Sequence, residues 1–101
     1  MKEVKHGKTY NTATATKLGD HKAYGRGDFR YIKESLYVTN NGSYFRAGEG
    51  GAMTAYAESY DGMTSGGDGI IPIPIEEALA WCERHAVAYD TIVNHFAVSE
   101  A

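Results

Sequence analysis

One apolar stripe with helical spacing runs through the last quarter of the chain. Its members recur at alternating intervals of four and three residues, at Ile75, Leu79, Cys82, Ala86, Tyr89, Val93 and Phe96. This spacing places them on one side of an α-helix, which must bury that side against another layer. Pro74 suits a first helical turn, and Glu76 and Glu77 suit the positive end of the helix dipole. The sequence therefore predicts one long C-terminal helix, or two helices broken near Tyr89-Asp90, packed on a sheet.

The strongest strand signal lies in residues 29–39, which are rich in aromatic and β-branched side chains. Its alternation slips at residues 33–35, which indicates a bulge or a break between two strands. Asn41-Gly42 follows, the pair favoured in a two-residue type I′ turn. That turn predicts a hairpin in which Val38 lies opposite Phe45 and Tyr37 lies opposite Arg46. Leu36, Val38, Phe45 and Ala47 would then share the buried face.

The other segments complete an α+β plan. Residues 2–10 are expected to form a first strand, residues 12–18 a short helical turn ended by Gly19, and residues 20–27 a turn. Residues 52–60 fit a strand or a short helix, and residues 61–69 read as a loop. Residues 70–73 read as an edge strand, because Pro72 has no N–H to donate. We expect a single domain, residues 1–101, with an antiparallel sheet of about four or five strands and a C-terminal helix packed on one face.

The residues capable of chemistry form no recognisable catalytic set. The glycines at 48, 50 and 51 lack the Gly-Lys-Ser/Thr ending of a phosphate loop, and Glu49 would repel a phosphate. The four histidines lack the spacing of a metal site. Cys82 lies on the apolar stripe, where a buried structural thiol is expected rather than a nucleophile. We therefore expect no enzymatic activity, no cofactor, no metal site and no small-molecule substrate.

Cysteine content and hydropathy bear on location. A single Cys cannot form an internal disulfide and favours a reducing compartment. The first 25 residues contain no apolar run typical of a signal peptide. No stretch approaches the roughly 20 apolar residues of a membrane helix. The expected location is the cytoplasm.

Charge is divided along the chain. Residues 1–46 hold nine of the ten Lys and Arg and four acids, a net of +5 (nine minus four). Residues 47–101 hold Arg84 and nine acids, a net of −8 (one minus nine). This asymmetry indicates a charged macromolecular partner.

The acidic half predicts one kind of partner. Residues 47–83 contain no Lys or Arg, and such a surface can occupy a basic groove built for nucleic acid. Tyr56 and Tyr60 are candidate aromatic anchors. The candidate acidic contacts are Glu49, Glu58, Asp61, Asp68, Glu76 and Glu77. An acidic face that is merely solvated, with no partner, is an equally open interpretation.

The basic half predicts another kind of partner. Lys22, Arg26, Arg30 and Lys33 could contact phosphates, with neighbouring aromatic rings stacking on bases. The alternative function is therefore a small nucleic-acid-binding accessory or regulatory module. The acidic remainder of the chain would repel the same polyanion.

Four separated segments occur in an order that resembles a known group of proteins. They are residues 10–15 (Tyr-Asn-Thr-Ala-Thr-Ala), residues 36–45, residues 48–53 (Gly-Glu-Gly-Gly-Ala-Met), and residues 70–81 with their Ile-Ile-Pro start, Glu77-Ala78 and Trp81. They resemble a family of small proteins and domains of bacteria, phages and other mobile elements. Asn11 stands where the family usually has Asp, and Pro74 stands where a Ser cap is common.

The resemblance implies a biological context rather than an activity. A short acidic member of such a family looks like an anti-CRISPR protein, which binds a bacterial CRISPR–Cas effector and blocks it. The expected function is therefore inhibition of such an effector in the cytoplasm of the host bacterium. Among the effectors, a type I surveillance complex is the one expected. No functional residue is carried over from the family.

Overall fold

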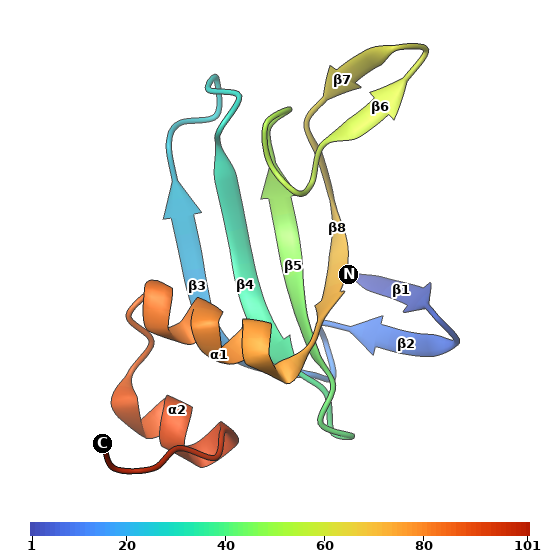
Figure 1. Ribbon diagram of the computed structural model, residues 1–101. Helices are drawn as coiled ribbons and strands as arrows, with labels where there is room; N and C mark the ends of the chain where they lie inside the picture. The colour runs from blue at the N-terminus through green and yellow to red at the C-terminus, as the bar shows by residue number, and fades with distance from the viewer.

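Four antiparallel strands form the centre of the structure, a computed structural model that describes residues 1–101 (Figure 1). In spatial order they are β3 (Thr16–Ala23), β4 (Ile32–Val38), β5 (Tyr44–Gly50) and β8 (Gly67–Ile73). Loops join the first three strands directly, whereas a further hairpin lies in the chain between β5 and β8. The α+β class and the four-stranded antiparallel sheet are thus confirmed.

Two small hairpins flank this sheet. The first joins β1 (Lys2–Lys5) to β2 (Lys8–Asn11), and the second joins β6 (Glu58–Tyr60) to β7 (Met63–Ser65). Their two-residue turns, His6-Gly7 and Asp61-Gly62, have positive φ at both positions. That geometry is typical of type I′ turns. The single strand expected over residues 2–10 and the loop expected over 61–69 are therefore both wrong.

Two helices complete the chain, α1 (Ile75–Arg84) and α2 (Tyr89–His95). The break falls at residues 85–88, slightly before the expected position, because Ala86 adopts a positive φ of 55° that interrupts the helix. The apolar stripe is consequently not one buried line: Cys82 is fully buried, whereas Tyr89 is 76 % exposed. Neither helix is long and apolar enough to cross a membrane.

The β4–β5 hairpin differs from expectation by one residue in register. Val38 pairs with Tyr44 and Tyr37 with Phe45. The Gly42 N–H donates to the Thr39 carbonyl, and Gly42 has φ 82°. This is a three-residue loop in which a type I turn is followed by a left-handed glycine. The shift places Phe45 and Ala47 on the face opposite Leu36.

Strand β3 replaces two other expected features. The helical turn expected over residues 12–18 is confined to residues 12–15, where the Ala15 N–H donates to the Asn11 carbonyl, and the turn expected over 20–27 begins only after Ala23. Both expectations are wrong for residues 16–23, because β3 pairs with β4 there. Threonines at its start favour extended backbone over helix. The bulge expected within residues 33–35 is also wrong, since β4 is continuous and the register shift lies in β3, between Lys17 and Gly19.

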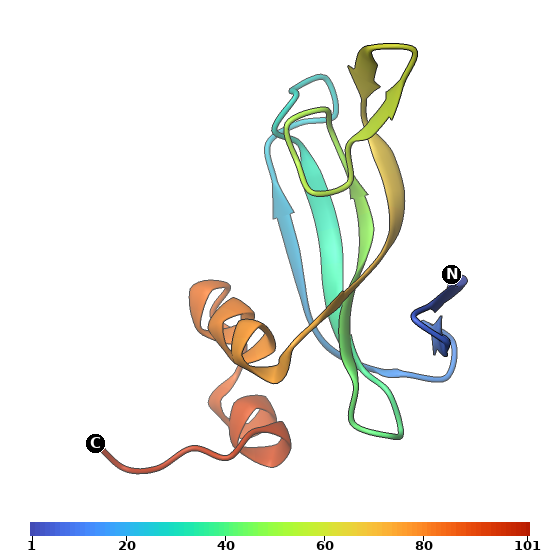
Figure 2. The same cartoon turned by 45° about the vertical axis from the view of Figure 1, so that its right-hand side comes forward.

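Each face of the sheet carries its own core. The helices cover one face. The core on that side consists of strand residues Leu18, Leu36 and Tyr44 packed against Ala78, Trp81, Cys82 and Phe96. On the other face, the chain around Tyr10 covers Phe45, Ala47 and Ile70. Figure 2 shows the helices and the β1–β2 hairpin on opposite sides of the sheet. The loop of residues 51–57 lies over the helix-side face at the end of the sheet away from the helices, where Tyr56 bonds to Glu34. The opposite face at that end is an open hollow.

Gly48, on β5, allows the backbones of β4 and β5 to approach closely. A Cβ on Gly48 would lie 2.1 Å from the Lys33 carbonyl oxygen and 2.6 Å from the Glu34 Cα. Both are backbone atoms, so no side-chain movement could relieve the overlap. We expect Gly48→Ala to destabilise the fold by about 1–3 kcal/mol, measured by urea unfolding with Trp81 fluorescence. The control is Gly25→Ala, where a Cβ meets nothing within 4 Å. Equal midpoints for the two variants would contradict this packing.

Candidate functional site

A buried carboxylate connects the separate parts of the molecule. Glu34 lies on β4, is 4 % exposed, and faces the helices. Its Oε2 accepts a 2.8 Å hydrogen bond from the Trp81 indole N–H on α1. Its Oε1 accepts a 2.8 Å bond from the Tyr56 hydroxyl and a 3.2 Å bond from Arg46 Nη1 on β5. One side chain thus joins two strands, a helix and the loop of residues 51–57.

This network holds Tyr56 in the interior of the protein. Tyr56 is only 4 % exposed, and burial together with its bond to Glu34 raises the pKa of its hydroxyl. It is therefore not available as a surface anchor, contrary to the expectation from sequence. Sequence reasoning also missed Glu34, although its inward phase with Ile32, Leu36 and Val38 along β4 was the available signal.

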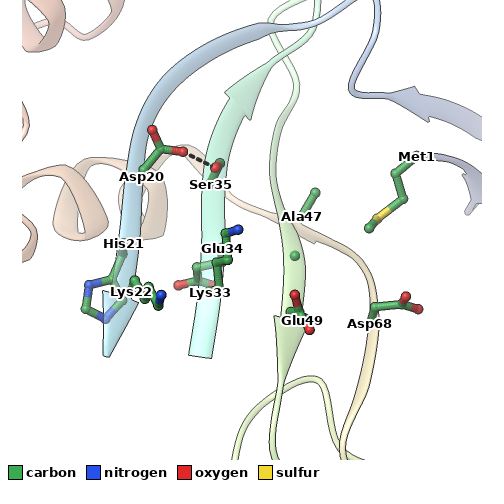
Figure 3. A pocket seen from close by; sticks show the side chains of 11 residues that line it. Met1, Asp20, His21, Lys22, Lys33, Glu34, Ser35, Ala47, Glu49 and Asp68 are labelled. Atoms are coloured by element: carbon green, nitrogen blue, oxygen red, sulfur yellow. Dashed lines mark hydrogen bonds between the residues drawn. The ribbon is translucent and has the colours of Figure 1, made fainter. Parts of the chain in front are cut away.

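The open face of the sheet carries a row of four charged residues. The strand register places Lys22 opposite Lys33, Lys33 opposite Glu49, and Glu49 opposite Asp68. Figure 3 shows these side chains across β3, β4, β5 and β8. They line a cavity of about 740 Å³ together with Met1 and the hydrogen-bonded pair Asp20 and Ser35. The two cations belong to the basic half of the chain and the two anions to the acidic half.

The six candidate acidic residues form two groups. Glu49 and Asp68 lie in the charged row, and Glu58 and Asp61 lie on the neighbouring β6–β7 hairpin. Glu76 and Glu77 lie on the first turn of α1, beyond the other end of β8. The single acidic face expected from the linear charge pattern is therefore absent. Glu49 also stands between Lys33 and Arg26, whose Nη2 is 3.4 Å from its carboxylate.

The four candidate basic residues also divide. Lys22 and Lys33 face the open cavity. Arg26 pairs with Glu49, and Arg30 pairs with Asp28 at 2.9 Å. The Arg30 guanidinium and its backbone N–H lower the pKa of the Asp28 carboxyl to about 2. Two of the four candidate phosphate contacts are thus already engaged by carboxylates.

The β6–β7 hairpin projects beyond the sheet, away from the helices (Figure 1). Tyr60 pairs with Met63 across it, and these side chains are 81 % and 75 % exposed. Asp61 occupies the turn between them, and Glu58 begins the hairpin. The hairpin therefore presents an aromatic ring, a thioether and two carboxylates, with no basic side chain. Met63 is a residue that sequence reasoning overlooked.

Two other groups with potential chemistry have structural surroundings. Cys82 is fully buried in the helix-side core, and burial raises the pKa of its thiol. His85 follows α1 and stacks on His21 of β3, with ring centroids 3.7 Å apart. Burial, followed by the neighbouring His21, lowers the pKa of His85.

No protein-family model, curated protein or solved structure matches the chain. The resemblance to the mobile-element family and the anti-CRISPR function that it implies therefore stay predictions.

The Glu34 network gives a direct test of stability. We expect Glu34→Ala to destabilise the protein by about 3–5 kcal/mol, because it leaves the Arg46 charge and two buried donors without their acceptor. Urea unfolding at neutral pH measures the change. The control is Glu58→Ala, whose carboxylate is exposed on β6. Similar midpoints for the two variants would show that the buried network contributes little.

The burial of His85 beside His21 predicts a pH dependence. The pKa of His85 is lower in the folded state than in the unfolded chain, where it is near 6.5. The unfolded state therefore binds the proton more readily, and stability falls as the pH drops through about 6.5. We expect His85→Gln to lose less stability than the native chain between pH 7.5 and 5.5 in urea unfolding. His6→Asn, in an exposed turn, is the control. Identical pH slopes for native protein and His85→Gln would refute this role.

Proposed function

We propose that this protein inhibits a bacterial CRISPR–Cas effector by occupying the surface on which the effector binds DNA. The effector that we favour is a type I surveillance complex. The observation that supports this proposal most strongly is the projecting β6–β7 hairpin. It presents a largely exposed aromatic–thioether pair, Tyr60 and Met63, flanked by carboxylates. Aromatic residues and methionine are enriched where proteins bind one another.

The charge of the hairpin is complementary to that of a DNA-binding groove. Such a groove carries Lys and Arg that neutralise phosphates. Glu58 and Asp61 would take the place of phosphates, and Asp68 extends the negative charge onto β8. Tyr60 and Met63 would fill an apolar recess between the basic side chains. Electrostatic attraction would speed the encounter and make it sensitive to salt.

The fold narrows the expected interface. Tyr56 is excluded by its burial, and Glu76 and Glu77 are excluded by their distance along β8 from the hairpin. The negative charge of Glu49 is partly neutralised by the neighbouring Arg26 guanidinium. The proposed contact set is therefore Glu58, Tyr60, Asp61, Met63 and Asp68.

Direct binding of nucleic acid is the alternative function. Lys22 and Lys33 are the cations free to meet phosphates on the open face, but Glu49 and Asp68 lie in the same row. A phosphate backbone crossing that row would meet repulsion as well as attraction. The alternative is retained as an outcome of the test below.

A gel-shift titration tests the proposal. Purified type I surveillance complex is mixed with labelled target DNA, and the protein is added in increasing amounts. We expect loss of the complex–DNA band at near-stoichiometric protein, with no shift of free DNA by the protein alone. A shift of free DNA that weakens steeply with salt would favour the alternative.

Hairpin variants then locate the interface. We expect Tyr60→Ala combined with Asp61→Lys to raise the inhibitory concentration at least about tenfold, a loss of roughly 1.4 kcal/mol or more. The matched control is Glu76→Lys with Glu77→Lys, which changes more charge but lies on α1. Unfolding midpoints of both variants verify their folding. Inhibition that survives the hairpin change, or that is lost with the control, would reject this interface.

A further inference from the structure

A second hollow surface lies at the opposite end of the molecule from the β6–β7 hairpin. It is a groove of about 650 Å³ formed by Leu79 and Glu83 of α1, by Tyr89, Ile92 and Val93 of α2, and by residues 96–100. Seven of its ten lining residues are hydrophobic. We call it the C-terminal groove. It shares no residue with the hairpin or the charged row.

The floor of the C-terminal groove is anchored to the sheet. Leu79 and Ile92 pack against the helix-side core. Phe96 is 6 % exposed and stacks on Tyr44 of β5, with ring centroids 5.1 Å apart. The Tyr44 hydroxyl also donates a 2.8 Å hydrogen bond to the His95 carbonyl. These contacts hold α2 and Phe96 against the sheet, and the exposed residues 97–100 continue from that fixed point to form the outer wall of the groove.

The rim of the C-terminal groove is apolar and acidic. Tyr89 is 76 % exposed and Val98 is 49 % exposed. The charged residues that line the groove, Glu83 and Glu100, are both negative. After Arg84 the sequence has no further Lys or Arg, and it adds Asp90 on the first turn of α2. An apolar trough with carboxylates at its rim is complementary to an apolar ridge flanked by cations.

We propose that the C-terminal groove binds a basic amphipathic helix of a partner protein. An amphipathic helix places apolar anchors at intervals of three and four residues along one ridge, with Lys and Arg on either side. The anchors would lie over Leu79 and Ile92, beside the exposed Tyr89 ring. The flanking cations would reach Glu83 on α1 and Glu100 after α2. This surface is separate from the proposed inhibitory interface and does not depend on it.

Fluorescence anisotropy with a defined probe tests the proposal. The probe is a fluorescein-labelled helical peptide of Leu and Lys with its leucines on one face. The reference peptide has the same composition, with its leucines distributed around the helix. We expect the native protein to bind the amphipathic peptide at least about tenfold more tightly. Equal affinity for the two peptides would show attraction by net charge alone and would overturn the proposal.

Variants of the protein separate the groove from general acidity. Tyr89→Ser with Val98→Ser should weaken probe binding about tenfold, and Glu83→Lys with Glu100→Lys should weaken it and reduce its salt dependence. The matched controls are Met53→Ser, where the side chain is 71 % exposed, and Glu58→Lys. Both lie outside the groove and should bind the probe as the native protein does. Controls that weaken binding as much as the groove variants would reject the site.

Discussion

The hydrogen bonds to the buried Glu34 carboxylate are the constraint on which the other parts of this structure depend. A buried carboxylate is costly unless its lone pairs are satisfied and a cation lies nearby. Here a strand supplies the cation (Arg46), a helix supplies an indole N–H (Trp81), and a loop supplies a hydroxyl (Tyr56). Each donor comes from a different segment, so the network favours only arrangements that bring all of them to β4. Gly48 contributes by leaving room beside Glu34 for the two strands to approach.

This arrangement leaves the chemically varied side chains at the periphery. The molecule measures 48 Å along its longest axis, with the β6–β7 hairpin toward one end and the helices toward the other. The sheet between them separates an acidic aromatic projection from an apolar acidic groove. Two surfaces that each suit basic partners therefore occur on one small domain. The binding roles that we propose for these surfaces rest on exposed apolar side chains and charges at the two ends of the sheet.

The general architecture was predictable because it follows from hydrophobic periodicity, whereas the register was not. The helical stripe led correctly to a C-terminal helical region on a sheet. The Asn41-Gly42 pair correctly located a hairpin, but a left-handed Gly42 after a type I turn lengthened the loop and moved Phe45 to the other face. Charge separation along the chain became separation across the sheet only in part, because β4 from the basic half pairs directly with β5, whose residues 47–50 belong to the acidic half. The β4–β5 hairpin follows from the local Asn41-Gly42 pair, whereas the β5–β8 pairing that brings Asp68 beside Glu49 joins segments distant in the sequence, and local residue patterns do not encode it.

A double-mutant cycle between Glu34 and Trp81 tests the central claim most directly. Trp81→Phe retains most of the ring but removes the N–H donor, and Glu34→Ala removes the acceptor. If the indole–carboxylate bond joins the helix to the sheet, the two changes should be coupled by about 1–3 kcal/mol in the free energy of unfolding. Additive effects of the two substitutions would mean that the helix is held by apolar packing alone, and would contradict the account.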